Sequence, residues 1–232
     1  MKKKILAFGA HPDDVEFGCG GLLIKEIKNG NEVTIVIGSL GEAGTNGTPA
    51  GRKAEATAAA KHIGAQVVFL NLGGDCHIEN TPKNILKLAE QIRKYTPHVV
   101  LAPSLTENQH PDHLIVAQMV RAAARYARYG GLTEIKKYPV HNIDALFYYP
   151  SSAEADKKPD IIVDVSNEYD AWATAMALHK SQIKTRGYIN LVTSRAQALG
   201  ASIGVKYATA LWVNDPVRLE SFSDLKVSSR NY

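Results

Sequence analysis

Four short, mostly apolar runs constrain the fold of this sequence more than any other feature. They span residues 5–8, 33–37, 67–70 and 98–102, and none shows a regular alternation of polar and apolar residues. Strands that are covered on both faces, as in a parallel sheet, have this composition. Segments of helical spacing separate the runs, at about residues 18–29, 52–62 and 82–95. The pattern predicts βαβ units with right-handed crossovers, and hence a mostly parallel sheet with helices on both faces.

The regular rhythm loosens after residue 103. We predict a helix at 111–129, strands at 145–149 and 161–165, and helices at 167–181 and 188–200. The length of 232 residues fits one domain of this kind better than two small ones. The sequence therefore predicts a single Rossmann-like α/β domain over residues 1–232. Its core would span about 1–150, and a C-terminal α-rich lobe would span about 151–232.

Composition and charge exclude several classes of protein. Apolar residues make up 45% of the chain, as expected of a globular fold with a buried core. The net charge is only +4 and the one basic run is Lys2–Lys4, so we expect no nucleic-acid partner. No stretch approaches about 18 consecutive apolar residues, and the start lacks the pattern of a secretory leader. We therefore expect no membrane partner.

The chain has two cysteines, Cys19 and Cys76. They are too few for a disulfide framework or a Cys-rich zinc site, although they leave a single disulfide open. This low number suits a reducing compartment. We predict a soluble, cytoplasmic protein.

Three polar clusters lie where predicted strands end, at residues 11–14, 41–48 and 107–113. In open parallel sheets, ligands bind outside the carboxyl ends of the strands. The strand pattern alone thus predicts that the three clusters form one site.

Two of these clusters contain the same tripeptide, His-Pro-Asp. They read His11-Pro12-Asp13-Asp14 and His110-Pro111-Asp112-His113. A lone histidine there would be explained by a backbone hydrogen bond, and a lone aspartate by helix capping. Two such units at one sheet edge instead predict a metal site. A histidine and an aspartate three residues apart would be joined by one histidine of the second unit, which leaves a position open for catalysis.

The type of metal is less constrained than the site. Two histidines and one carboxylate also describe non-haem iron oxygenases. Those enzymes commonly have all-β barrels, which this chain does not resemble. We therefore expect hydrolytic Zn²⁺, with Fe²⁺ able to occupy the same ligands.

The sequence resembles the LmbE-like, or PIG-L, family of metal-dependent N-acetylglucosaminyl deacetylases. The resemblance rests on residues 10–14, 20–21, 41–45, 52–55 and 110–113, and it reaches Gly187-Tyr188 near the end of the chain. Within the family, it is similar to the deacetylases of bacillithiol biosynthesis, which remove the acetyl group from N-acetylglucosaminyl malate.

The resemblance implies a role for each of eight residues. They are the metal ligands His11, Asp14 and His113, the general base Asp13, the general acid or oxyanion stabiliser His110 with its orienting Asp112, the substrate-binding Arg52, and the oxyanion-stabilising Tyr188. These roles agree with the needs of amide hydrolysis, which are an activated water, a polarised carbonyl and a proton for the departing amine.

Other positions carry weaker signals. Arg52 has an alternative as a solvated cation at a helix start, and Tyr188 as a packing residue. We expect Asp75 and His77 to line the cleft without catalysis. His62, His98, His141 and His179 are interpreted as structural or surface residues, and Cys19 as a small buried residue.

The predicted substrate is a small glycoside, N-acetyl-α-D-glucosaminyl L-malate. One alternative is another glycan, such as a chito-oligosaccharide. A second alternative is a sugar- or nucleotide-binding module that kept the fold and lost catalysis. The family resemblance also implies a homo-oligomer, a hexamer.

Overall fold

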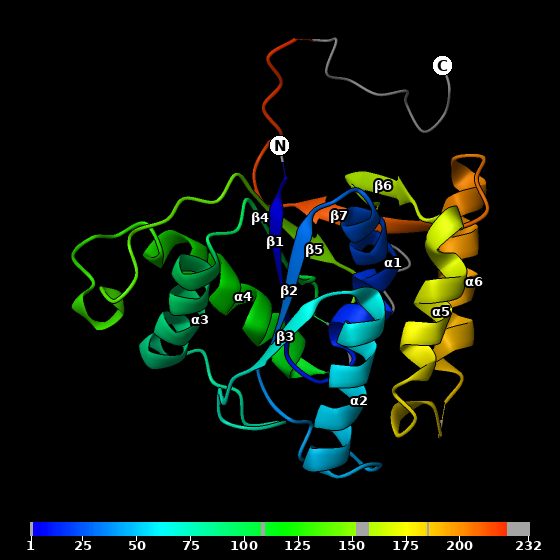
Figure 1. The fold of residues 1–232 in the computed structure, drawn as a ribbon, viewed down its shortest axis with the longest axis horizontal. Coiled ribbons are helices and arrows are strands. Elements are labelled where there is room, and N and C mark those ends of the chain that lie inside the picture. The colour runs from blue at the N-terminus through cyan, green and yellow to red at the C-terminus, as the bar shows by residue number, and fades with distance from the viewer. Residues whose placement is uncertain (1, 108–109, 152–157, 185, 222–232) are drawn as a thin grey trace.

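The computed structural model describes residues 2–107, 110–151, 158–184 and 186–221. Within these ranges the chain forms one sheet of seven strands in the order β3-β2-β1-β4-β5-β7-β6 (Figure 1). The strands are β1 (Lys4–Gly9), β2 (Glu32–Ile37), β3 (Gln66–Phe69), β4 (Val99–Pro103), β5 (Ala145–Tyr149), β6 (Ile161–Asp164) and β7 (Ala208–Val213). The first five are parallel, and β7 runs antiparallel to both β5 and β6. The predicted α/β fold with a mostly parallel sheet is confirmed.

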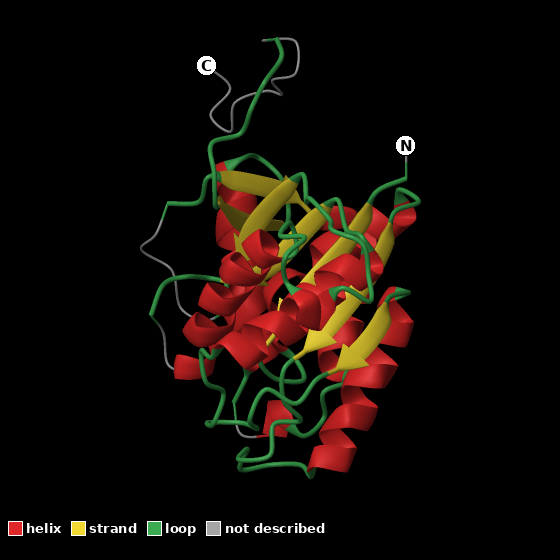
Figure 2. Ribbon diagram, turned by 90° about the vertical axis from the view of Figure 1, so that its left-hand side faces the viewer, coloured by secondary structure: helices red, strands yellow, loops and turns green. Residues whose placement is uncertain are grey.

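Helices cover both faces of the sheet, as predicted. They are α1 (Asp14–Lys28), α2 (Pro49–Ile63), α3 (Pro82–Tyr95), α4 (Pro111–Tyr126), α5 (Tyr169–Ala177) and α6 (Tyr188–Ser202). Figure 1 shows α3 and α4 on one side of the sheet and α1, α2, α5 and α6 on the other. Each side has its own apolar core, one built with Leu88 and Val116 and the other with Leu23 and Trp172. Figure 2 shows the arrowheads of several strands pointing toward a group of loops at one edge of the sheet.

Strand β7 was not predicted from the sequence. Its residues, ATALWV, combine weak strand formers with Thr, Trp and Val, so local preference gives no clear signal. The strand forms because it pairs with β5 and β6, which precede it by more than forty residues. The segment after β5 therefore adds two strands, β6 and β7, to the common sheet, and two helices, α5 and α6, that pack against it.

The predicted start of the first helix, near Gly18, is wrong by four residues. Helix α1 begins at Asp14 and is kinked at Cys19, whose φ of −146° is not helical. The apolar face from Leu22 onward gave the prediction, and it marks only the regular part after the kink. The first turn forms because the Asp14 carboxylate accepts hydrogen bonds from the backbone N–H groups of Ala10 and His11.

Other helix bounds also differ from the prediction. Helix α2 begins at Pro49 rather than Arg52, because the Thr48 hydroxyl caps it by accepting from the Gly51 N–H. Helix α4 ends at Tyr126 instead of 129, and α5 covers only the middle of the predicted segment 167–181.

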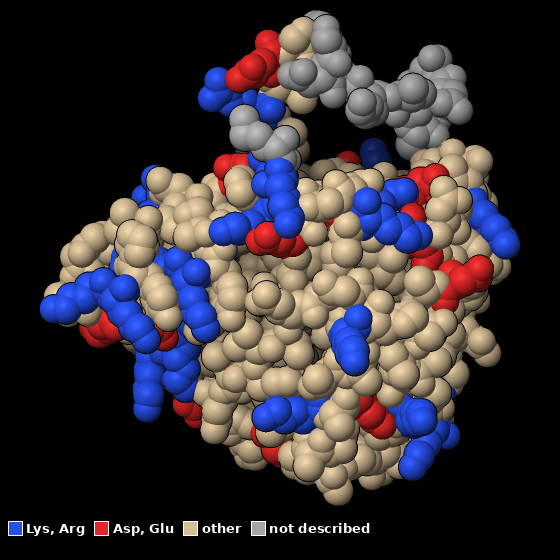
Figure 3. Space-filling view, in the orientation of Figure 1, with Lys and Arg blue, Asp and Glu red and all other residues tan. Residues whose placement is uncertain are grey.

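Charge is spread over the surface in small groups. On the face drawn in Figure 3, basic and acidic side chains lie among larger uncharged areas, and several basic ones gather at the edge beside α3. In the described part of the chain, no helix is long and apolar enough to cross a membrane.

Trp172 offers a test of how firmly the C-terminal segment is joined to the rest. It is 2% exposed, packs on Gly20 and Gly21 of α1, and donates from Nε1 to the Glu16 carbonyl at 2.7 Å. We predict that Trp172→Ala lowers the free energy of unfolding by about 3–5 kcal/mol, in a single transition. Chemical denaturation followed by circular dichroism measures this. The control Leu191→Ala, at a position 39% exposed, should change it by less than about 0.5 kcal/mol. Equal effects of the two variants would contradict the packing described.

Candidate functional site

Four strand ends meet at one edge of the sheet. The segments that follow β1, β2, β3 and β4 carry His11–Asp14, the loop from Ser39, Asp75–Cys76 and His110–His113. The chain leaves β1 toward α1 on one face of the sheet, and it leaves the neighbouring strand β4 toward α4 on the other face. The switch point of a parallel sheet is where such folds bind ligands. The predicted convergence of the polar clusters is thus observed, with a fourth cluster added by β3.

The three predicted metal ligands lie together. One donor atom each from His11, Asp14 and His113 lies within 4.8 Å of the others. Asp14 Oδ1 is 3.0 Å from His113 Nε2, and Asp14 Oδ2 is 3.6 Å from His11 Nδ1. All three side chains are at most 11% exposed. Two imidazoles and a carboxylate suit a catalytic cation such as Zn²⁺, so the residues present fit a divalent metal.

The charges of this triad are tightly balanced. Burial alone would lower the pKa of His11, but the Asp14 carboxylate raises it well above its usual value. His113 behaves in the same way, and its pKa is raised by Asp14 against the effect of burial. Burial would raise the pKa of Asp14, but His113 and His11 hold it well below its usual range. The negative field that favours protons on these imidazoles also favours a divalent cation at the same atoms.

Asp13, the predicted general base, lies beside the triad and is held differently from Asp14. Its backbone φ of 124° lies in a region that L-residues rarely adopt, so the tight turn fixes the direction of its side chain at a cost in strain. The side chain is 20% exposed. Burial and the neighbouring Asp14 raise the pKa of Asp13 to about 6, while Arg52 and His179 oppose this shift. A carboxylate of this kind is suited to accept a proton near neutral pH.

A second group of donor atoms adjoins the first. It consists of His11, Asp75, His110 and Asp112. His11 Nε2 lies 3.1 Å from both Asp75 Oδ1 and Asp112 Oδ2. His110 Nε2 lies 3.3 Å from Asp75 Oδ1, whereas Asp112 Oδ2 is 3.9 Å from His110 Nδ1. Asp75 is therefore the nearer carboxylate partner of His110, and the orienting role of Asp112 stays a prediction.

The pKa values in this second group follow from the same contacts. Burial, and then the neighbouring His11, lower the pKa of His110. The hydrogen bond from His11 lowers the pKa of Asp75 against the effect of burial. His110 is 31% exposed at its side chain, so it lies at the open side of the site.

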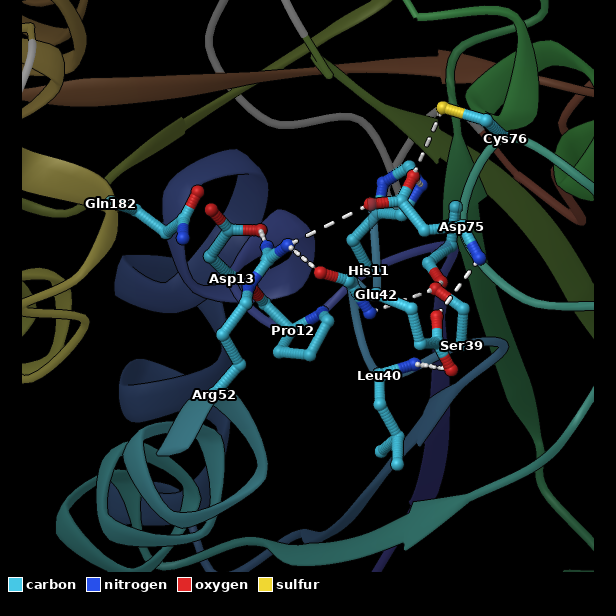
Figure 4. Close-up of polar contacts among 12 residues, drawn as sticks. His11, Pro12, Asp13, Ser39, Leu40, Glu42, Arg52, Asp75, Cys76 and Gln182 are labelled. Atoms are coloured by element: carbon cyan, nitrogen blue, oxygen red, sulfur yellow. Dashed lines mark hydrogen bonds and ion pairs between the residues drawn. The ribbon is translucent and has the colours of Figure 1, made fainter. Parts of the chain in front are cut away.

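Arg52 is buried at the centre of the site rather than at its rim. Its guanidinium donates to the carbonyls of Gly41 at 3.1 Å and Pro12 at 3.0 Å, and it lies 3.5 Å from Asp13 (Figure 4). A Cβ on Gly41 would lie 1.8 Å from Arg52 Nη1, so only glycine permits this approach. Arg52 thus ties the loop after β2 to the turn after β1. The alternative of a solvated cation is wrong, since the residue is 4% exposed.

Tyr188 lies at the start of α6, and its ring contacts are with Phe17 and Arg186. Its predicted action on an oxyanion stays a prediction, since within the described residues Tyr188 makes no polar contact with the two donor groups.

Asp75 was underestimated from the sequence. It is 5% exposed and contacts His11 and His110, and Arg52 Nη1 lies 3.9 Å away. Its backbone N–H donates to Glu42 at 2.9 Å, which fixes it to the loop after β2. Its position in the loop that follows the third strand was the available signal, because each neighbouring strand end had supplied a site residue.

A family model described as "PIG-L: GlcNAc-PI de-N-acetylase" matches residues 6–124, more than half of the chain. The chain belongs to the PIG-L family. The matched segment contains both donor groups, Asp13 and Arg52, and it ends before Tyr188. The protein is an enzyme of this metal-dependent deacetylase family.

Curated relatives cover most of the chain. Diacetylchitobiose deacetylase of Thermococcus kodakarensis is 29% identical over 78% of this chain and 70% of its own length. A probable N-acetyl-α-D-glucosaminyl L-malate deacetylase of Bacillus cereus is 25% identical over 78% and 84%. A 4-oxalmesaconate hydratase of Pseudomonas putida is 26% identical over 73% and 70%.

Solved structures agree with this fold. A conserved protein of Thermus thermophilus superimposes with a TM-score of 0.80, at 28% identity, over 94% of this chain and 97% of its own. The diacetylchitobiose deacetylase of Pyrococcus horikoshii gives a TM-score of 0.82 at 24% identity, over 91% and 83%, and supports the fold alone.

The ligand triad predicts a specific loss of metal. We expect His113→Ala to lose most of the divalent ion that the wild-type protein binds, because one of three protein donors is removed. Metal analysis after gel filtration measures the content per chain. His77→Ala is the control, since this exposed residue is in neither donor group. Full occupancy in His113→Ala would rule out the third ligand, and His110 would be tested next.

Proposed function

We propose that the protein hydrolyses the acetamide of an N-acetylglucosamine conjugate, N-acetyl-α-D-glucosaminyl L-malate, with Zn²⁺ as its cation. The observation that carries the hydrolytic part is the position of Asp13. Its carboxylate adjoins the ligand triad without belonging to either donor group. A cation site with a separate carboxylate beside it is the arrangement that water activation needs.

Each site residue has a separate proposed role in amide hydrolysis. A divalent cation held by His11, Asp14 and His113 would polarise a carbonyl oxygen and lower the pKa of water. Asp13 accepts a proton from the attacking water as the water oxygen forms a bond to the acetyl carbonyl carbon. The C–N bond then breaks, and the amine leaves with a proton. His110, on the open side, stabilises the negative oxygen or supplies that proton, held by Asp75 and Asp112.

Two residues keep narrower proposed roles. Arg52 contributes positive charge beside Asp13 and would pair with the malate carboxylate of the substrate. Tyr188, whose ring contacts Phe17 of α1, would donate its hydroxyl to the oxyanion.

The malate conjugate is favoured by the Bacillus cereus relative, which matches this chain over most of its length. A second candidate is diacetylchitobiose, because the relative from Thermococcus kodakarensis acts on it by name and is 29% identical. We also propose a cytoplasmic location and a hexamer, both of which rest on the family resemblance.

Mass spectrometry of the purified enzyme with a panel of substrates tests the proposal. We expect loss of one acetyl group from N-acetylglucosaminyl malate, in clear preference to diacetylchitobiose and free N-acetylglucosamine. Equal rates would reject the malate assignment. No loss of acetyl from any conjugate would reject the deacetylase itself, and hydration of an unsaturated dicarboxylic acid would then be measured, because of the hydratase relative.

The Arg52→Ala variant extends this panel. If Arg52 binds the malate carboxylate, its loss should weaken binding of the malate conjugate about 10- to 150-fold more than binding of an uncharged conjugate. This factor corresponds to about 1.5–3 kcal/mol for a charged hydrogen bond. Arg186→Ala, at an exposed guanidinium on the ring of Tyr188, is the comparison. Equal losses on both substrates for Arg52→Ala would assign the residue to the reaction centre.

Asp13 and Asp14 are distinguished by a pair of substitutions. Asp13→Asn keeps the shape and removes the base, so kcat should fall by about 10²–10⁴-fold while the metal content stays unchanged. Asp14→Ala should instead lose metal, and added zinc should partly restore activity. If Asp13→Asn loses its metal while Asp14→Ala retains it, the two roles must be exchanged.

The pH dependence gives an independent check on Asp13. A base acts when deprotonated, so kcat/KM should rise with pH through its pKa, which is about 6 from the protein groups and is lowered by a bound cation. This acidic limb should flatten in Asp13→Asn.

A further inference from the structure

A cysteine lies at the open side of the site, and neither the family resemblance nor the proposed reaction uses it. Cys76 follows directly after Asp75, is exposed, and has a φ of 63°. Its Sγ lies 3.5 Å from Asp75 Oδ1 and 3.7 Å from His110 Nε2 (Figure 4 shows the first contact). The third distance, from Asp75 Oδ1 to His110 Nε2, is 3.3 Å. Thiol, carboxylate and imidazole donors therefore form a small triangle.

The size of this triangle matches one face of a zinc tetrahedron. With Zn–S of about 2.3 Å and Zn–N and Zn–O of about 2.0 Å, tetrahedral angles separate N from O by about 3.3 Å and S from either by about 3.5 Å. The three observed separations lie within about 0.2 Å of these values, without any side-chain movement. Water would complete the four positions, since His110 and Cys76 face the open side.

The surrounding charges favour a cation at this point. Asp75 and Asp112 lie on the inner side, and Asp112 Oδ2 accepts the backbone N–H of Cys76 at 2.9 Å. Burial, and then the carboxylates of Asp75 and Asp112, raise the pKa of the Cys76 thiol. The thiol is thus protonated at neutral pH, and a soft divalent ion would displace the proton to solvent as the metal–sulfur bond forms.

We propose that Asp75, Cys76 and His110 form a second, weaker site for a thiophilic divalent cation such as Zn²⁺, separate from the site of His11, Asp14 and His113. Occupation of this site takes the Nε2 atom of His110 and one oxygen of Asp75 out of catalysis. Excess zinc then inhibits the enzyme. The inhibition rests on the proposed function of His110, whereas the binding does not.

Titration with Co²⁺ tests the binding directly. A cobalt–thiolate bond gives a near-ultraviolet charge-transfer band that nitrogen and oxygen ligands do not give. We expect no such band during the first equivalent, which the stronger site takes, and its growth during the second. Cys76→Ser should abolish the band and leave the first equivalent unchanged. Cys19→Ala is the matched control, because Cys19 is buried in the core, and it should retain the band.

Inhibition is measured separately, as acetate release at rising Zn²⁺. Cys76→Ser should keep the activity at one equivalent and need at least about tenfold more zinc for half-inhibition, because even outer partners of a metal change its affinity on this scale. Absence of the thiolate band in the wild-type protein, or its persistence in Cys76→Ser, would overturn the site. If the band appears as expected in a protein without deacetylase activity, the site stands and only the proposed reaction fails.

Discussion

The carboxylate of Asp14 connects three of the segments that form the site. One oxygen accepts the backbone N–H groups of Ala10 and His11, which ends β1 and starts α1 in the same turn. The other oxygen lies 3.0 Å from His113 on α4. A single side chain thus joins the strand end, the first helix and the helix after β4. Because the sheet order places β4 beside β1, His113 near the start of α4 comes close to Asp14, which follows β1.

The same junction separates two chemically identical neighbours. Asp14 lies between two imidazoles, which keep its pKa low. Asp13 lies in a strained turn with its carboxylate near Arg52. Burial and the neighbouring Asp14 raise the pKa of Asp13. Opposite environments for adjacent carboxylates are a common way to provide both a permanent anion and a proton acceptor in one site. Asp14 is therefore suited to bind a cation, and Asp13 is suited to accept a proton.

Much of this arrangement was predictable from the sequence. Unalternating apolar runs predict parallel strands, and the rule for strand ends then brings His11 and His113 to one edge although about a hundred residues separate them. What the sequence could not predict depends on tertiary contacts. Strand β7 exists because of its partners, the burial of Arg52 depends on the approach of Gly41, and Asp75 acquires its importance from two histidines on other segments.

The most direct measurement is a crystal structure of the protein prepared with one equivalent of zinc, with the ion located by its anomalous scattering. We expect that ion in bonding contact with His11, Asp14 and His113, with the Asp13 carboxylate beside it but not bonded. An ion found first between Asp75 and His110, or one bonded to Asp13 in place of Asp14, would contradict this organisation of the site.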